Sequence, residues 1–203
     1  FIASSQVVLN SSPENISRLE KSVVYNAFDT NEKYNKNLSR KMINRQFPNC
    51  KDKILLGYVG RLVNYKNVDF LIKTLPEIIV KSEKSFHLLI AGNGSEKYME
   101  YLNDVIHELN LCDNVSFSGF VNNPSELISG LDILIASSGI DAFGRTIVES
   151  MLQSTPVLAA NKGGHLEILE DEKDGLFYEM NCKSSLTEKI IKLVDDSSFR
   201  EQL

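Results

Sequence analysis

Two acidic residues, Asp141 and Glu149, stand eight positions apart around a segment that could bind an anion. Between them, Phe143-Gly144 stands where a helix is expected to begin, after an apolar run from Asp132 to Ala136. The first N–H groups of a helix lack partners and the helix dipole is positive at that end, so this end attracts an anion. Glu149 lies about one and a half turns further on, at ~3.6 residues per turn, and could accept hydrogen bonds from a diol. An anion site beside a carboxylate suits a sugar nucleotide, although the spacing alone fits an ordinary loop before a helix equally well.

Basic residues follow an earlier apolar run, Ile54 to Val59, which has the pattern of a buried strand. Gly60-Arg61 ends this run, and Lys66 comes after a short loop. Gly60 allows a ligand to approach the backbone closely, Arg61 can bind phosphate oxygens with its forked guanidinium, and Lys66 adds a point charge. A solvated loop with two cations is the alternative interpretation of the same residues.

Apolar runs that alternate with helical patterns predict the elements that position these residues. Six runs have the pattern of strands: Ile54–Val59, Phe86–Ala91, Val115–Ser118, Asp132–Ala136, Pro156–Ala160 and Leu176–Tyr178. Helical patterns cover residues 31–46, Val68–Lys81, about Ser95–Asn110, Asn123 to about Gly130, the segment from Gly144 to Gln153, and Ser184–Asp195. Such alternation is typical of an α/β fold with parallel βαβ units and helices on both faces of one sheet. In such a sheet the ligand binds at the carboxyl ends of the strands.

The two ends of the chain have their own signals. Ser12-Pro13-Glu14 has the residue types of a helix start, which predicts a short helix to about Leu19. Val23 to Tyr25 is expected to be a strand. The chain begins without Met and stops inside a helical pattern, so we expect a domain excised from a longer protein.

Composition narrows the class of protein. The 203 residues are 42% hydrophobic and 24% charged, which is ordinary for a globular chain that can fill a core. A net charge of −5 argues against a broad surface for nucleic acid or anionic membranes. No run of apolar residues is long enough to span a bilayer. Three sparse cysteines favour a reducing compartment, so we expect a cytoplasmic protein.

Other chemistries have weaker support in the sequence. His87, His107 and His165 lie far apart and show no metal-ligand spacing, so no metal is expected. Gly92-Asn93-Gly94 follows a strand but lacks the third glycine of a dinucleotide fingerprint, which disfavours a nicotinamide-dependent dehydrogenase.

The order of these motifs resembles one family, the retaining, nucleotide-sugar-dependent glycosyltransferases of the two-domain GT-B type, called group 1. Its usual string is Glu-x-Phe-Gly-x4-Glu, followed by Ala-Met-Ala-x-Gly-x-Pro-Val. This chain matches at Phe143, Gly144, Glu149, Met151, Pro156 and Val157, and departs with Asp141 for the first Glu, Ser150 for Ala and Ser154 for Gly.

Five further elements extend the resemblance over about residues 20 to 195. They are Asn26-Ala27-Phe28-Asp29, the string from Gly60 to Asn67, the turn with Gly92 and Gly94, the segment Phe117 to Val121, and Gly163-Gly164-His165-Leu166-Glu167. The resemblance implies that residues 26–203 are the C-terminal, Rossmann-like donor-binding domain. Residues 1–25 would then be the end of the N-terminal domain or a linker. An N-terminal acceptor-binding domain, with any peripheral contact to the inner face of a membrane, would lie outside this chain.

The resemblance also implies roles for individual residues in transferring a sugar from a nucleoside diphosphate sugar with retention of configuration. Arg61, Lys66 and the helix start would bind the diphosphate, Asp141 the donor sugar, and Glu149 the ribose. The remaining donor-binding residues would be Gly60, Gly92, Gly94, Phe120, Val121, Phe143, Gly144, Arg145 and Thr146. Neither a metal nor another cofactor is implied. Because Asp141 is one methylene shorter than Glu, a non-catalytic nucleotide- or sugar-binding module of the same fold is the alternative.

Overall fold

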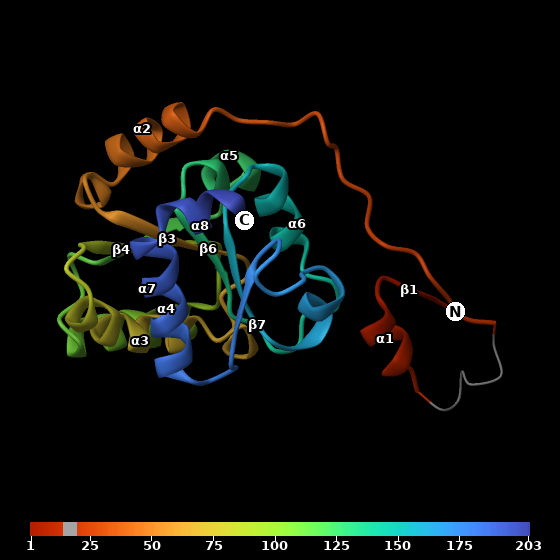
Figure 1. The fold of residues 1–203 in the computed structure, drawn as a ribbon. Helices are drawn as coiled ribbons and strands as arrows, with labels where there is room; N and C mark the ends of the chain where they lie inside the picture. The colour runs from red at the N-terminus through yellow and green to blue at the C-terminus, as the bar shows by residue number, and fades with distance from the viewer. Residues whose placement is uncertain (14–19) are drawn as a thin grey trace.

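The computed structural model describes residues 1–13 and 20–203. Most of the short helix predicted to end near Leu19 falls on residues 14–19 and therefore lies outside the described residues. The main part of the chain is one parallel sheet between two layers of helices (Figure 1).

Six parallel strands form the main sheet in the order β5-β4-β3-β6-β7-β8. In chain order they are β3 (Ile54–Val59), β4 (Phe86–Ala91), β5 (Val115–Gly119), β6 (Ile133–Ala136), β7 (Val157–Ala160) and β8 (Leu176–Tyr178). All six were predicted to within one residue at each end. Their sequences are continuous apolar runs because helices bury both faces of a parallel sheet.

Each face of the sheet packs against its own set of helices (Figure 1). One face packs against α3 (Val68–Lys81), α4 (Glu96–Glu108) and α7 (Lys183–Asp195). The other face packs against α2 (Lys36–Gln46), α5 (Pro124–Ser129) and α6 (Arg145–Leu152). Alternate residues of one strand separate the two cores, since Leu88 and Ile90 belong to the first and Leu89 to the second. The α/β prediction with helices on both faces is confirmed.

Short elements complete the body of the chain. The described residues include the 3-10 helices η2 (Pro48–Cys50), η3 (Asn64–Lys66) and η4 (Gly163–Glu167). A last helix, α8 (Ser197–Gln202), follows α7, and its Phe199 packs against the first core.

Two predicted elements differ from the structure. The helix expected over residues 31–46 begins only at Lys36, because the Asn35 side chain accepts a hydrogen bond from Leu38 N and caps the helix there. The strand expected at Val23 to Tyr25 is shorter and earlier, at Ser22–Val23 (β2). Its partner is β1 (Ile2–Ala3), in a small sheet of two parallel strands.

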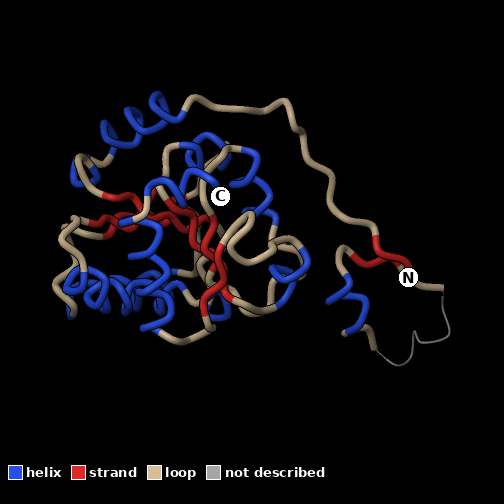
Figure 2. Tube along the Cα trace, viewed as in Figure 1, coloured by secondary structure: helices blue, strands red, loops and turns tan. Residues whose placement is uncertain are grey.

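The N-terminal elements lie beside the main body. A short helix, α1 (Gln6–Asn10), follows β1, and an irregular stretch leads from β2 to α2, drawn as a loop in Figure 2. The division into domains at residue 25 stays a prediction.

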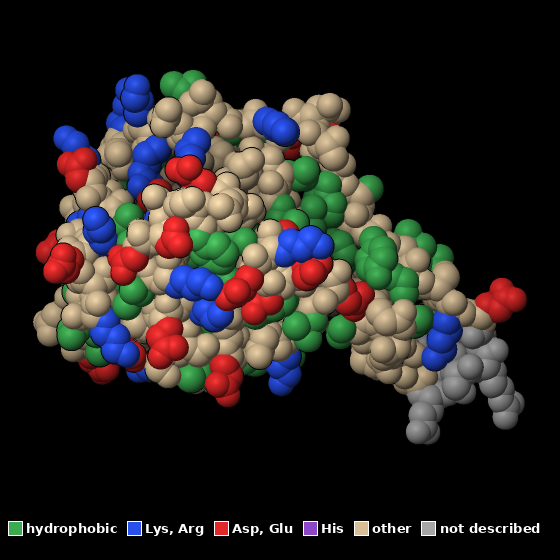
Figure 3. Space-filling view, viewed as in Figure 1, with side chains coloured by type: hydrophobic (Ala, Val, Ile, Leu, Met, Phe, Trp, Pro, Cys, Tyr) green, Lys and Arg blue, Asp and Glu red, His purple; other side chains and the backbone are tan. Residues whose placement is uncertain are grey.

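The surface agrees with the modest net charge. Acidic and basic side chains are interspersed over the face of the molecule shown in Figure 3. Among the described residues, none of the helices combines the length and the apolar character needed to cross a bilayer.

Candidate functional site

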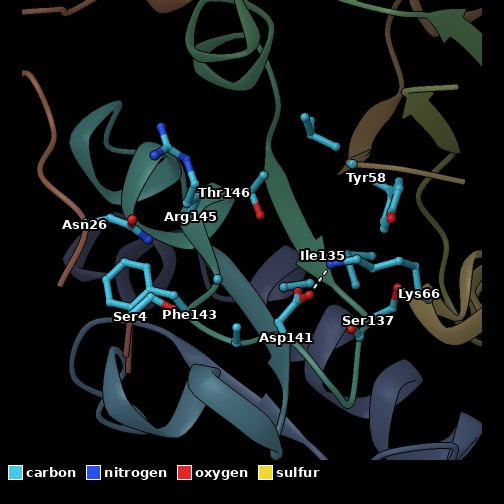
Figure 4. A pocket seen from close by; sticks show the side chains of 16 residues that line it. Ser4, Asn26, Tyr58, Lys66, Ile135, Ser137, Asp141, Phe143, Arg145 and Thr146 are labelled. Carbon is cyan, nitrogen blue, oxygen red and sulfur yellow. Dashed lines mark hydrogen bonds and ion pairs between the residues drawn. The ribbon is translucent and has the colours of Figure 1, made fainter. Parts of the chain in front are cut away.

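Two loops meet at the carboxyl edge of the main sheet. β3 and β6 are hydrogen-bonded neighbours, so the loop after Val59 lies beside the loop after Ala136. Between them is a cavity of about 340 Å³. Its lining includes residues from both loops, from the start of α6 and from the N-terminal stretch: Ser4, Asn26, Tyr58, Gly60, Lys66, Ser137, Asp141, Phe143, Gly144, Arg145 and Thr146 (Figure 4).

Lys66 and Asp141 form an ion pair across this cavity (Figure 4). The side chain of each is 18% exposed. The backbone of Lys66 is fixed from the opposite loop, because the Ser137 hydroxyl donates to the Lys66 carbonyl oxygen at 2.6 Å. Within residues 1–13 and 20–203, Asp141 is the only hydrogen-bond acceptor of the Lys66 ammonium. The other protons of that ammonium can therefore bind a ligand.

Asp141 has a second partner in His165, whose Nε2 lies 3.3 Å from the other carboxylate oxygen. Burial raises the pKa of Asp141, but the hydrogen bonds with His165 and Lys66 outweigh it and lower the pKa to about 2. The carboxylate is therefore ionised at neutral pH.

The helix α6 begins at the cavity wall. Its first flanking residue, Gly144, has φ 96°, a left-handed conformation that favours glycine. A Cβ at this position would also lie 3.2 Å from the His165 ring. In the described chain no side chain caps this helix, so its first N–H groups remain available. The helix start predicted at Gly144 is confirmed, and its role in binding an anion stays a prediction.

A second cavity of about 300 Å³ shares Val59 and Gly60 with the first. Arg61, Gly92, Phe120 and Val121 also line it, and Phe120 is 71% exposed. Gly92 is required there, because a Cβ would lie 1.8 Å from the Gly60 carbonyl oxygen. The apolar walls suit a flat aromatic group.

Six of the predicted site residues do not line the first cavity, which we call the Lys66 cavity. Three of them, Gly92, Phe120 and Val121, line the second cavity. The guanidinium of Arg61 donates to the Tyr65 hydroxyl at 2.6 Å and lines only the second cavity. Glu149 lines a third cavity of about 120 Å³ and pairs with Arg145 at 3.4 Å. Gly94 lines none of these three cavities. Its backbone forms an isolated bridge with Leu62.

The N-terminal stretch is held against the signature segment. The Phe143 ring lies 5.7 Å from the ring of Tyr25 and 6.2 Å from that of Phe28. The Glu167 carboxylate accepts hydrogen bonds from Gln6 N at 2.8 Å and Val7 N at 2.7 Å, at the start of α1. These contacts bring Ser4 and Asn26 to the cavity.

Sequence reasoning missed Ser4, Asn26 and the contact of His165 with Asp141. The only signal for His165 was its place in the string Gly163 to Glu167, which carried no role for the ring. In the described part of the chain, no group of three side chains has a metal-binding arrangement.

The sequence of this chain matches those of proteins in one known family. The profile of the family "Glycosyl transferases group 1" matches residues 39–203, so the chain belongs to this family. An uncharacterized glycosyltransferase of Methanocaldococcus jannaschii is 30% identical over 154 residues, which are 75% of this chain and 38% of that protein. A Campylobacter jejuni protein is 28% identical over 88% of this chain and 46% of its own length. Its name is N-acetylgalactosamine-N,N'-diacetylbacillosaminyl-diphospho-undecaprenol 4-alpha-N-acetylgalactosaminyltransferase. This chain thus spans less than half of each relative.

Solved structures show the same fold. Anabaena HepE, in complex with UDP and glucose, has a TM-score of 0.86 and 25% identity, covering 99% of this chain and 55% of HepE. The parallel sheet of this chain is thus Rossmann-like, as in glycosyltransferases of the GT-B type.

Proposed function

We propose that this chain is the donor-binding part of a retaining glycosyltransferase that uses a nucleoside diphosphate sugar. The observation that carries the proposal is the Lys66 cavity. It joins a lysine, a carboxylate and an uncapped helix start at the carboxyl edge of a parallel sheet. The complex of HepE with UDP and glucose supports the proposal, since its fold is shared over nearly the whole of this chain.

Cavity size supports a ligand of nucleotide-sugar dimensions. Sites for small molecules usually have about 300–1,000 Å³. The first two cavities have about 340 and 300 Å³ and share a rim at Gly60, so together they reach the middle of that range. The polar first cavity would hold the diphosphate and sugar, and the apolar second cavity the base.

Catalysis would rest on stabilising the charge that grows on the leaving diphosphate. Lys66, Arg145 and Thr146 line the same cavity, and no side chain of the described residues caps the helix start. The Lys66 ammonium and the N–H groups of Arg145 and Thr146 would then act as preorganised donors to the diphosphate. The Arg61 side chain would also bind the diphosphate, after its hydrogen bond to the Tyr65 hydroxyl breaks. The Glu149 carboxylate would bind the ribose after its ion pair with Arg145 breaks, and Asp141 would contact the donor sugar. This arrangement provides charge stabilisation from side chains and backbone, without a metal.

The wider setting belongs to the same proposal. Residues 26–203 would be the donor-binding domain, and residues 1–25 would lead from an acceptor-binding domain of the same protein. Relatives named for O-antigen and capsular polysaccharide biosynthesis support a role in making polysaccharide. The longer protein would act in the cytoplasm, at the inner face of a membrane.

Calorimetry with UDP, GDP and ADP in the presence of a chelator tests this function. We expect at least one of them to bind with millimolar affinity or better. The nucleotide that binds then selects the sugar nucleotides for assays of transfer and donor hydrolysis by the longer protein. If all three nucleotides fail to bind to the folded chain, the proposed function is wrong. If a donor binds but is neither transferred nor hydrolysed, the chain is a binding module.

A further inference from the structure

His165 is a fully buried imidazole beside the proposed site. It has 0% exposure, and its Nδ1 lies 3.0 Å from the Ala160 carbonyl oxygen at the end of β7. A carbonyl oxygen only accepts, so Nδ1 must carry a proton to form this bond. Nε2 faces the ionised carboxylate of Asp141, which also only accepts. Both bonds form together when the ring is an imidazolium, with a proton on each nitrogen.

The backbone around the ring is fixed as well. Gly164 N donates to the Asp141 carbonyl oxygen at 2.8 Å. A Cβ at Gly164 would lie 2.6 Å from the Ala142 carbonyl oxygen, so η4 packs directly on the loop that carries Asp141. The ring therefore approaches the Asp141 carboxylate from a rigid base.

A bound ligand would affect the two partners of Asp141, Lys66 and His165, differently. Lys66 lines the cavity, and a diphosphate there would draw its ammonium away from Asp141. A partly buried carboxylate that loses one partner needs another hydrogen-bond donor to remain stable and in place. His165 is buried behind the carboxylate and does not line the cavity, so it keeps its bond when Lys66 leaves.

We propose that His165 is a positioning residue that holds the Asp141 carboxylate toward the donor sugar while Lys66 turns to the diphosphate. This inference rests on the proposed function and names the residue that sets the sugar contact.

The His165 ring makes two hydrogen bonds, and two substitutions each keep only one of them. In His165→Gln the side-chain amide can reach the place of Nε2 and donate to Asp141. In His165→Asn the shorter amide takes the place of Nδ1, donates to the Ala160 carbonyl oxygen and does not reach Asp141. The affinities of this chain for UDP-glucose and UDP, the ligands solved with HepE, are measured by calorimetry for the wild type and both variants.

We expect His165→Asn to weaken the binding of UDP-glucose about tenfold, which corresponds to about 1.4 kcal/mol. The binding of UDP should weaken less than about twofold, because only the contact with the sugar is lost. His165→Gln should restore most of the UDP-glucose affinity. Equal weakening of UDP and UDP-glucose in His165→Asn, or a folded His165→Gln that fails to restore the affinity, would overturn the inference. A wild type that binds neither ligand overturns the proposed function, and the inference with it.

A second measurement needs no variant. The ¹⁵N shifts of the His165 ring in the wild-type chain should show a proton on Nε2, with and without UDP-glucose. An Nε2 without a proton in the complex contradicts the inference, because it could not donate to Asp141.

Discussion

The same two neighbouring strands, β3 and β6, carry an ion pair at each end. At the amino end, Arg40 contacts Asp132 at 2.6 Å, and at the carboxyl end Lys66 contacts Asp141. The side chains of the four residues are exposed to a similar extent, 24% and 20% in the first pair and 18% each in the second.

The two pairs differ in what else the charged groups contact. Arg40 also donates to the carbonyl oxygens of Gly130 and Lys53, and Asp132 also accepts from Leu55 N. That pair therefore fixes α2 against the starts of both strands. The Lys66 ammonium has no second acceptor in the described chain and lines a cavity. The two ion pairs are thus buried to a similar extent but have different roles, one structural and one at a cavity. Their other contacts, and not their burial, distinguish these roles.

The largest effect is expected from breaking the Arg40 pair. Asp132→Ala leaves a partly buried guanidinium and Leu55 N without their partner, so the free energy of unfolding should fall by about 3 kcal/mol. Urea denaturation measures this loss. UDP affinity at a temperature where the variant is folded should match the wild type, and a large loss of affinity there would contradict a purely structural role.

Lys66→Met should have the opposite effect, a large loss of UDP affinity with little loss of stability. Loss of a charged hydrogen bond of about 1.5–3 kcal/mol weakens UDP about tenfold to a hundredfold. The free energy of unfolding should change by less than about 1 kcal/mol, because Asp141 keeps His165. A variant that binds UDP normally would remove Lys66 from the site.

The stability of the fold should depend on the ionisation of Asp141 at acid pH. The pKa of Asp141 falls from 3.8 to about 2 on folding. Its ionised form therefore stabilises the fold fully above its unfolded pKa, and this contribution is lost as the pH falls through about 2. Between these two values the stability of wild type should fall more steeply than that of Asp141→Asn. Parallel curves would show that the carboxylate is not stabilised by its partners.

The smallest effect is expected at the N-terminal stretch. Glu167→Gln removes the negative charge that caps α1, worth about 1 kcal/mol, so the amides of Gln6 and Val7 should exchange about fivefold faster. UDP affinity should change less than twofold. Unchanged exchange at both amides would show that Glu167 does not hold α1.

The sheet could be predicted from the sequence because buried parallel strands are continuous apolar runs with little ambiguity in length. In the structure Lys66 lies beside Asp141 because they follow the neighbouring strands β3 and β6, an order that was not predicted from the sequence. The helix start at Lys36 was missed because the choice of Asn35 as cap is local and the preceding polar residues are also compatible with a helix. The contact of His165 with Asp141 spans 24 positions and depends on the tight packing of η4. The side-chain direction of Arg61 depends on Tyr65, and that of Glu149 on Arg145, which the motif alone does not determine.

A crystal structure of this chain grown with UDP-glucose would show directly whether the Lys66 cavity binds the donor. We expect the diphosphate to contact the Lys66 ammonium and the first N–H groups of α6, with the glucose beside Asp141 and the uracil beside Phe120. A diphosphate bound at another place on a folded chain would contradict this expectation.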